Sequence, residues 1–288
     1  MTEDILSIIE SQAPSFSKGQ RRIAAYITES YDKAAFLTAS KLGKAVGVSE
    51  STVVRFAMEL GYDGYPSMQK AMQDMVMNRL TTVQRMDMSS DRIGNQDVVG
   101  SVLQADMEKL RQTQDNLNRQ DFQQAVDALL GAKSIYVIGA RSAAALASFF
   151  GYYLNYMFEN VHVITASGSS EMLEKLVNVK SDDAVLAISF PRYSSATVKG
   201  VQHCRQAGAT VIGLTNSSLS PLAQACDYLL LAKSDMMSFV DSLVAPLSVV
   251  NALLVALASG RSEVLEKNFD TLERVWDAYH VYEKRTDL

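Results

Sequence analysis

Hydroxyl and guanidinium side chains occur together in two short stretches of the sequence, GARSAAA at 139–145 and SFPRYSSAT at 189–197. A serine hydroxyl can donate a hydrogen bond to a phosphate oxygen, and a guanidinium can hold a phosphate or carboxylate through two parallel hydrogen bonds. The two stretches therefore predict a site for a small anionic ligand. Its candidate residues are Gly139, Arg141, Ser142, Ser189, Arg192, Ser194 and Ser195.

Each of these stretches follows a short apolar run and leads into a helical pattern. Five such runs are rich in β-forming residues and are separated by helical segments: 134–138, 161–165, 184–189, 209–215 and 227–232. This alternation predicts a doubly wound α/β domain with a five-stranded parallel sheet covered on both faces. In such a sheet, ligands bind beyond the carboxyl ends of the strands where the strand order reverses, close to helix N-termini.

A purely structural interpretation of the same stretches stays open. Serines at helix starts commonly cap the helix, and an arginine there can pair with a neighbouring carboxylate.

A different chemistry is indicated by ASKLGKAVGVSESTVVRFAMEL at 39–60. A helix-turn-helix needs a small residue where its helices meet, a glycine with positive φ in the turn and apolar side chains that lock the angle. Gly43 and Gly47 meet the first two needs. The interlocking apolar positions are Leu42, Val46, Val48, Val53 and Phe56.

The second helix of this motif would present a polar face to the major groove of DNA. Arg55 could contact guanine or a phosphate, Ser51 and Thr52 could bond base edges or phosphates, and Val54 could pack on a thymine methyl. Lys44 could follow the phosphate backbone. The candidate DNA-binding residues are Lys44, Ser49, Glu50, Ser51, Thr52, Val54 and Arg55. The alternative is a plain helical hairpin with a solvated face.

The charge distribution permits a nucleic-acid partner. The formal net charge is −5, yet residues 17–85 carry ten Lys and Arg against six Asp and Glu, whereas residues 86–288 carry seventeen against twenty-three. Two cysteines, Cys204 and Cys226, and no N-terminal signal segment predict free thiols in a cytoplasmic protein. Asp241, Pro246 and Asn251 interrupt the longest apolar run, so we expect no membrane span. No metal site, cofactor or catalytic motif is evident in the sequence.

The change from helical to alternating periodicity suggests four parts. We expect an all-α helix-turn-helix domain at 1–80, a linker and connecting helix at 81–120, the α/β domain at 121–260 and a C-terminal helix or tail at 261–288. The overall fold class is α/β.

The sequence LTASKLGKAVGVSESTVVRFAMELGYDGYPSMQ at 37–69 resembles the N-terminal domain of the RpiR/MurR family of bacterial transcriptional regulators. In that family the domain precedes a sugar isomerase (SIS) domain that senses a phosphorylated sugar. The resemblance implies operator DNA and a phosphorylated sugar or similar anion as partners, a homodimer or homotetramer, and regulation of carbon metabolism. SIS domains hold the sugar phosphate with a serine after the first strand and a Ser-x-Ser-Gly-x-Thr loop after the third.

This sequence matches the SIS pattern only in part. Ser142 matches the serine after the first strand, and Ser189 and Ser194 match the first and last residues of the loop after the third strand. Pro191 and Arg192 replace the Ser-Gly in the middle of that loop. The substitution leaves an acidic or unphosphorylated ligand open. An alternative function is a sugar-phosphate isomerase with an accessory helical domain, for which Glu171 and Glu174 are possible bases.

Overall fold

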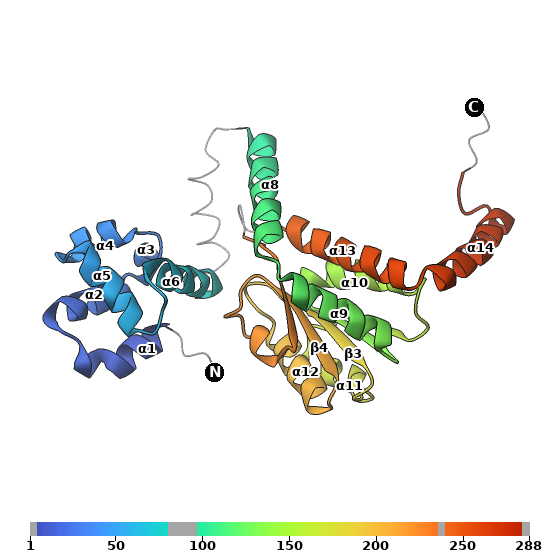
Figure 1. The fold of residues 1–288 in the computed structure, drawn as a ribbon, viewed down its shortest axis with the longest axis horizontal. Helices are drawn as coiled ribbons and strands as arrows, with labels where there is room; N and C mark the ends of the chain where they lie inside the picture. The colour runs from blue at the N-terminus through green and yellow to red at the C-terminus, as the bar shows by residue number, and fades with distance from the viewer. Residues whose placement is uncertain (1–4, 80–96, 236–239, 284–288) are drawn as a thin grey trace. The chain divides into compact units, whose positions relative to one another are not determined.

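The computed structural model describes residues 5–79, 97–235 and 240–283. The chain divides into two compact units, Met1–Met88 and Ser89–Leu288, each with its own hydrophobic core (Figure 1). Of the linker and connecting helix expected at 81–120, residues 81–96 lie outside the described residues.

The N-terminal unit is all-α, as predicted. Its elements are α1 (Ile5–Gln12), the 3₁₀ turn η1 (Ala13–Ser15), α2 (Lys18–Glu29), α3 (Tyr31–Ala34), α4 (Ala39–Val46), α5 (Glu50–Glu59) and α6 (Tyr65–Arg79). Ile23, Leu42, Phe56 and Met68 are fully buried at the centre of this unit. The helices therefore enclose one core to which the helix-turn-helix contributes directly.

Side chains at the helix starts explain where these helices begin. The Ser17 hydroxyl accepts from the backbone N–H of Gln20, and the Gln20 side chain accepts from the Ser17 N–H at 2.7 Å, which forms a capping box. The hydroxyls of Thr38 and Ser49 cap α4 and α5 by accepting from the backbone N–H groups of Lys41 and Thr52. Each cap satisfies a backbone donor that the first helical turn leaves unpaired.

The C-terminal unit is built on a five-stranded parallel sheet with the strand order β2-β1-β3-β4-β5. Its strands are β1 (Ile135–Gly139), β2 (Val161–Ile164), β3 (Ala184–Ile188), β4 (Thr210–Thr215) and β5 (Tyr228–Leu231). All five lie within the runs predicted from the sequence to within one residue. The strand order reverses between β1 and β3.

Helices cover both faces of this sheet. The helices of this unit are α8 (Val98–Asn116), α9 (Arg119–Gly131), α10 (Ala143–Leu154), α11 (Ser169–Lys175), α12 (Ser195–Gln206), the short η2 (Ala223–Ala225), α13 (Val244–Gly260) and α14 (Ser262–Tyr279). Successive strand residues belong to different cores: Val137 lies in the core that includes residues of α9, α10 and α13, and Ile138 in the core that includes residues of α11 and α12. The two groups of helices lie on opposite sides of the sheet (Figure 1). The fold is therefore the doubly wound α/β domain predicted above.

Helix α14 leaves the body of the C-terminal unit at a sharp bend after α13 (Figure 1). None of its residues is buried, although Leu265 packs against the core and the Asn268 side chain donates to the carbonyl of Tyr156 at 2.8 Å. In the described part of the chain, no single helix is both long and apolar enough to cross a membrane. Helices α13 and α14 reach that hydropathy only together, across a bend of 96°.

Candidate DNA interface and candidate effector site

Two glycines form the turn between α4 and α5. A Cβ atom added to Gly43 would lie 2.8 Å from the carbonyl oxygen of Val48, so only glycine lets the two helices approach this closely. Gly47 has φ of +70°, a left-handed conformation that glycine adopts without strain. Arg22 Nη2 donates to the Gly47 carbonyl at 2.9 Å, which ties α2 to the turn. The angle between the helices is therefore set by backbone contacts.

The predicted recognition residues have different surroundings. Lys44, Glu50, Ser51 and Arg55 are exposed, as the interface requires. Val54 is half-buried and packs against the core of the unit, so little of it is left for a thymine methyl.

The hydroxyls at the start of α5 are bonded to one another. Ser49 Oγ lies 2.9 Å from Ser51 Oγ and 2.8 Å from Thr52 Oγ1, and it also accepts from the Thr52 N–H. Ser49 therefore serves as the N-cap of α5. The predicted DNA contacts that are exposed on α5 itself are Glu50, Ser51 and Arg55, and of these the Ser51 hydroxyl is also bonded to Ser49.

The two serine-bearing stretches start side by side in the sheet. Gly139 at the end of β1 is in register with Ile188 at the end of β3, and these neighbouring strands flank the point where the strand order reverses. The loops that follow them lead directly into α10 and α12. The topology therefore places both stretches at the position where open parallel sheets bind ligands.

The turn from β1 into α10 has an unusual backbone conformation. Arg141 has φ of +59°, in the left-handed region, whereas Gly139 at the end of the strand does not. Gly139 is needed for space instead, because an added Cβ would lie 2.6 Å from the carbonyl oxygen of Ala143. A left-handed non-glycine residue is strained by about 1 to 2 kcal/mol, and such strain is concentrated at functional sites.

Ser142, the residue before α10, does not cap its helix. Its hydroxyl donates to Asp241 Oδ2 at 3.2 Å instead. Asp241 lies in the segment that precedes α13, 99 residues further along the chain. The Ser142 hydroxyl, which was predicted to donate to an anionic ligand, thus donates to the carboxylate of Asp241.

In the second loop, the predicted residues have different roles. Ser194 caps α12 by accepting from the Thr197 N–H at 3.4 Å, while Ser195 is exposed at the first helical position. Ser189 is only 4% exposed, and Arg192 is exposed. The capping interpretation therefore holds for Ser194, and Ser189 and Arg192 are the better candidates for ligand contacts.

Two further hydroxyls in this region were not predicted from the sequence. Thr197, in the first turn of α12, and Thr215, at the carboxyl end of β4, are fully buried, and their Oγ1 atoms have no hydrogen-bond partner in the described part of the chain. Ser234, after β5, is 3% exposed and equally unpaired. A buried unpaired hydroxyl is unfavourable by about 1 to 3 kcal/mol. The sequence held one indication that Thr215 could contact a ligand, namely its position at the end of a predicted strand.

Neither the two glutamates considered as bases nor the two cysteines are activated by their surroundings. Glu171 and Glu174 are exposed on α11, and Glu171 forms an ion pair with Lys175 at 2.9 Å. Both cysteines are free, and burial raises the pKa of Cys204 and of Cys226 to about 12, so neither is a thiolate at neutral pH. Among the described residues, no group of three or more His, Cys, Asp or Glu side chains could hold a metal ion.

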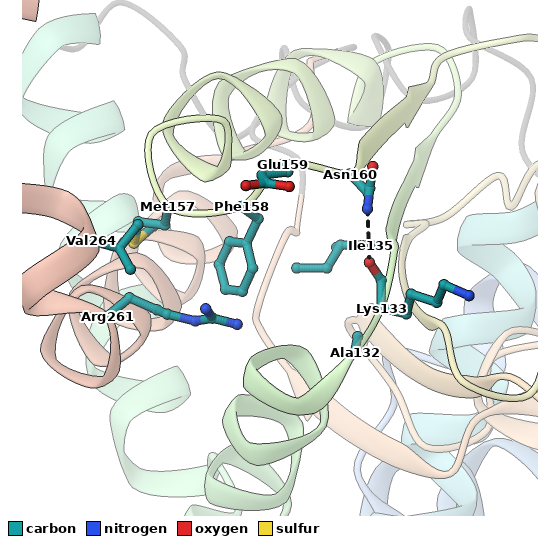
Figure 2. Close-up of a pocket in the computed structure, with 9 residues that line it drawn as sticks. All are labelled: Ala132, Lys133, Ile135, Met157, Phe158, Glu159, Asn160, Arg261 and Val264. Atoms are coloured by element: carbon teal, nitrogen blue, oxygen red, sulfur yellow. Dashed lines mark hydrogen bonds between the residues drawn. The ribbon is translucent and has the colours of Figure 1, made fainter. Parts of the chain in front are cut away.

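A separate pocket of about 240 Å³ opens beside the amino end of β1, at the edge of the sheet opposite the serine loops (Figure 2). Its polar groups are largely bonded within the protein. Arg261 donates to the Leu130 carbonyl and stacks on the Phe158 ring, and the Asn160 amide donates to the Lys133 carbonyl. The polar side chains of this pocket are thus engaged with the protein itself, unlike the hydroxyls near the serine loops that are unpaired among the described residues.

Comparison with known proteins identifies the two domains. Residues 3–79 match the family model described as the helix-turn-helix domain of the rpiR family, and residues 128–256 match the SIS domain model. The regulator HexR of Escherichia coli strain K12 is 27% identical over 280 residues, which cover 96% of this chain and 94% of HexR.

Two solved structures have the same fold. The sugar isomerase domain of an RpiR transcription factor from Sphaerobacter thermophilus is 29% identical with a TM-score of 0.59, and the match covers 62% of this chain and 99% of that one. The Vibrio vulnificus NanR protein, solved in complex with ManNAc-6P, is 22% identical with a TM-score of 0.59 over 95% of this chain and 98% of that one.

A helix-turn-helix unit followed by a SIS domain defines a class of ligand-responsive transcriptional regulators. This chain combines the helix-turn-helix domain of the rpiR family with a SIS domain.

Proposed function

We propose that this protein is a cytoplasmic transcriptional regulator that binds operator DNA through α5 and responds to a phosphorylated sugar at the carboxyl edge of its sheet. The observation that carries the proposal is the pairing, in one chain, of an RpiR-type helix-turn-helix with a SIS domain whose two serine loops start side by side.

For DNA, the proposed contacts are Ser51 and Arg55 from the start of α5 and Lys44 from α4, all exposed. A basic side chain on a groove-facing helix can contribute both base contacts and sequence-independent phosphate contacts. A single helix-turn-helix reads few base pairs, so two copies of the chain on two half-sites would supply the specificity.

For the effector, the proposal is supported by NanR, a protein of the same fold that was solved in complex with the sugar phosphate ManNAc-6P. In this chain we propose Ser142, Ser189 and Arg192 as ligand contacts, with the Thr197 and Thr215 hydroxyls available to the sugar. The guanidinium of Arg192 stands where the family loop has a glycine. It would hold the anion by charge-assisted hydrogen bonds.

We also propose that the SIS domain senses its ligand without converting it. An isomerase needs a base close to the sugar C1 and C2, whereas Glu171 is exposed and paired with Lys175. HexR of Escherichia coli, which matches nearly the whole of this chain, is itself a regulator. Turnover of a pentose or hexose phosphate that Glu171→Gln abolishes would instead support the isomerase alternative.

A homodimer or homotetramer is proposed from the surface of α14. An unbroken series of ring contacts joins Tyr156, Phe269, Trp276 and Tyr282, and Phe269 is 36% exposed. An apolar cavity of about 320 Å³ lies beside them, between α10, α13 and α14. Sedimentation analysis of the protein and of Phe269→Asp would test whether this face joins two copies.

A thermal-shift titration tests the proposed function directly, because a ligand that binds only the folded protein raises its melting temperature. Matched sugars with and without phosphate would be compared, together with sugar acids. We expect stabilisation by one phosphosugar, and altered affinity of the protein for DNA selected from a random pool when that sugar is present. Stabilisation by sugar acids alone would mean that Pro191 and Arg192 have changed the ligand class.

A further inference from the structure

The short segment before α13 contacts two places at once. Asp241 accepts a hydrogen bond from the hydroxyl of Ser142 at 3.2 Å, at the proposed effector site. The next residue, Ser242, donates to Asp106 Oδ1 on α8 at 2.7 Å. Because the two residues are adjacent, a displacement of the Asp241 side chain is felt by Ser242 through a single peptide unit.

The face of α8 that accepts this hydrogen bond is largely buried. Asp106, Lys109 and Thr113 share one helix face because they are three and four residues apart. Lys109 Nζ pairs with Asp106 Oδ1 at 3.1 Å and its residue is only 6% exposed. A buried charge needs its partner, so Asp106 is held in place.

A second bond fixes α8 to the other side of the same connection. The backbone N–H of Lys233, just after β5, donates to Thr113 Oγ1 at 2.9 Å, and Thr113 is 6% exposed. Helix α8 is therefore joined to the chain on both sides of the β5–α13 connection. It is also the first described helix after the segment that leads from the DNA-binding unit.

An anion and the Asp241 carboxylate compete for the same donor. Both would accept from the Ser142 hydroxyl, which has one proton to donate, and their like charges repel at that distance. An anionic ligand bound at Ser142 therefore favours a state in which Asp241 has moved away.

We propose that Asp241 and Ser242 couple effector binding to α8: an anionic effector at Ser142 displaces the Asp241 carboxylate and thereby breaks the bond from Ser242 to Asp106. This inference rests on the proposed effector site. It assigns the first step of the response to a named bond, and it requires the two states of α8 to bind the effector with different affinity.

The test measures phosphate affinity and the hydrogen exchange of residues 98–116 in the full chain, with inorganic phosphate as the probe. We expect phosphate to accelerate exchange in α8 of the wild-type protein. Asp241→Asn removes the competing charge and should bind phosphate about fivefold more tightly or better. In Ser242→Ala, exchange in α8 should be fast already and should not respond to phosphate.

Ser248→Ala is the matched control, because that hydroxyl bonds only within its own helix, to the Val244 carbonyl, and should leave the wild-type response intact. An α8 response that persists in Ser242→Ala, or an Asp241→Asn affinity no tighter than wild type, overturns the coupling. If Ser142→Ala weakens phosphate binding but phosphate does not change hydrogen exchange in α8 of the wild-type protein, the coupling is wrong and the proposed effector site stands. If the wild-type protein binds no phosphate, or if Ser142→Ala binds it equally well, the proposed effector site fails together with the coupling.

Discussion

Gly43 faces the carbonyl oxygen of Val48 so closely that a Cβ atom on Gly43 would lie 2.8 Å from it. This contact joins the two helices of the helix-turn-helix through a backbone atom that cannot rotate away. The orientation of the proposed recognition helix therefore depends on the absence of one methyl group.

Gly43→Ala should destabilise the N-terminal unit by about 1 to 3 kcal/mol through overpacking, and should weaken DNA binding because α5 is displaced. Urea unfolding followed by circular dichroism measures the first effect. Gly19→Ala is the matched control within the same unit, because its Cβ would meet only ordinary contacts at 3.6 Å, and we expect it to be neutral or slightly stabilising. Equal stability of the two variants would contradict the close contact.

Arg55→Ala should weaken specific DNA binding by about 1 to 3 kcal/mol and relax the sequence preference at one base pair. Fluorescence anisotropy with selected DNA and its single-base variants measures both quantities. Lys133→Ala removes the same charge from an exposed position in the C-terminal unit and should change binding little. If Arg55→Ala weakens all sequences equally, Arg55 contacts a phosphate and not a base.

Ser142→Ala combined with Ser189→Ala should abolish the response to the effector while DNA binding stays intact. The hydroxyls are proposed to serve the ligand, and the DNA-binding residues belong to the other unit. Anisotropy titrations with and without the effector test this. Loss of DNA binding in the double variant would mean that these serines support the fold.

Thr215→Val should have opposite effects on stability and on ligand affinity. Valine has nearly the same shape as threonine and removes a buried hydroxyl that has no partner in the described part of the chain, so the C-terminal unit should gain up to about 1 kcal/mol. If that hydroxyl contacts the sugar, effector affinity should fall. A variant that is neither more stable nor weaker in binding would show that Thr215 is not part of the site.

Above pH 9, the buried thiol of Cys204 should make stability depend on pH. Burial raises its pKa from 9.0 to about 12 in the folded protein, so between these values the unfolded chain loses the proton and the folded chain keeps it. The stabilisation is present below pH 9 and is lost as the pH rises, by about 1.4 kcal/mol at pH 10 relative to pH 8. Urea unfolding at both pH values should show a smaller loss in Cys204→Ala than in the wild-type protein.

Elements defined by short-range patterns could be predicted from the sequence. The caps at Ser17, Thr38 and Ser49, the glycine turn at Gly47 and all five strands depend on residues within a few positions of each other. Local backbone preferences and hydrophobic periodicity are enough to determine such features. The likeness to a family then indicated which loops carry the proposed ligand residues.

The chemistry within those loops depended on tertiary structure. Ser142 meets Asp241 across 99 residues and Ser242 meets Asp106 across 136, so no local pattern could have shown either bond. Likewise, the burial of Val54 and the unpaired hydroxyl of Thr215 follow from how helices and strands pack. The sequence by itself determined the two folds and the residue types at each proposed site. Only the packing decided which polar groups are available to a ligand, because hydrogen-bond partners are chosen by proximity in space.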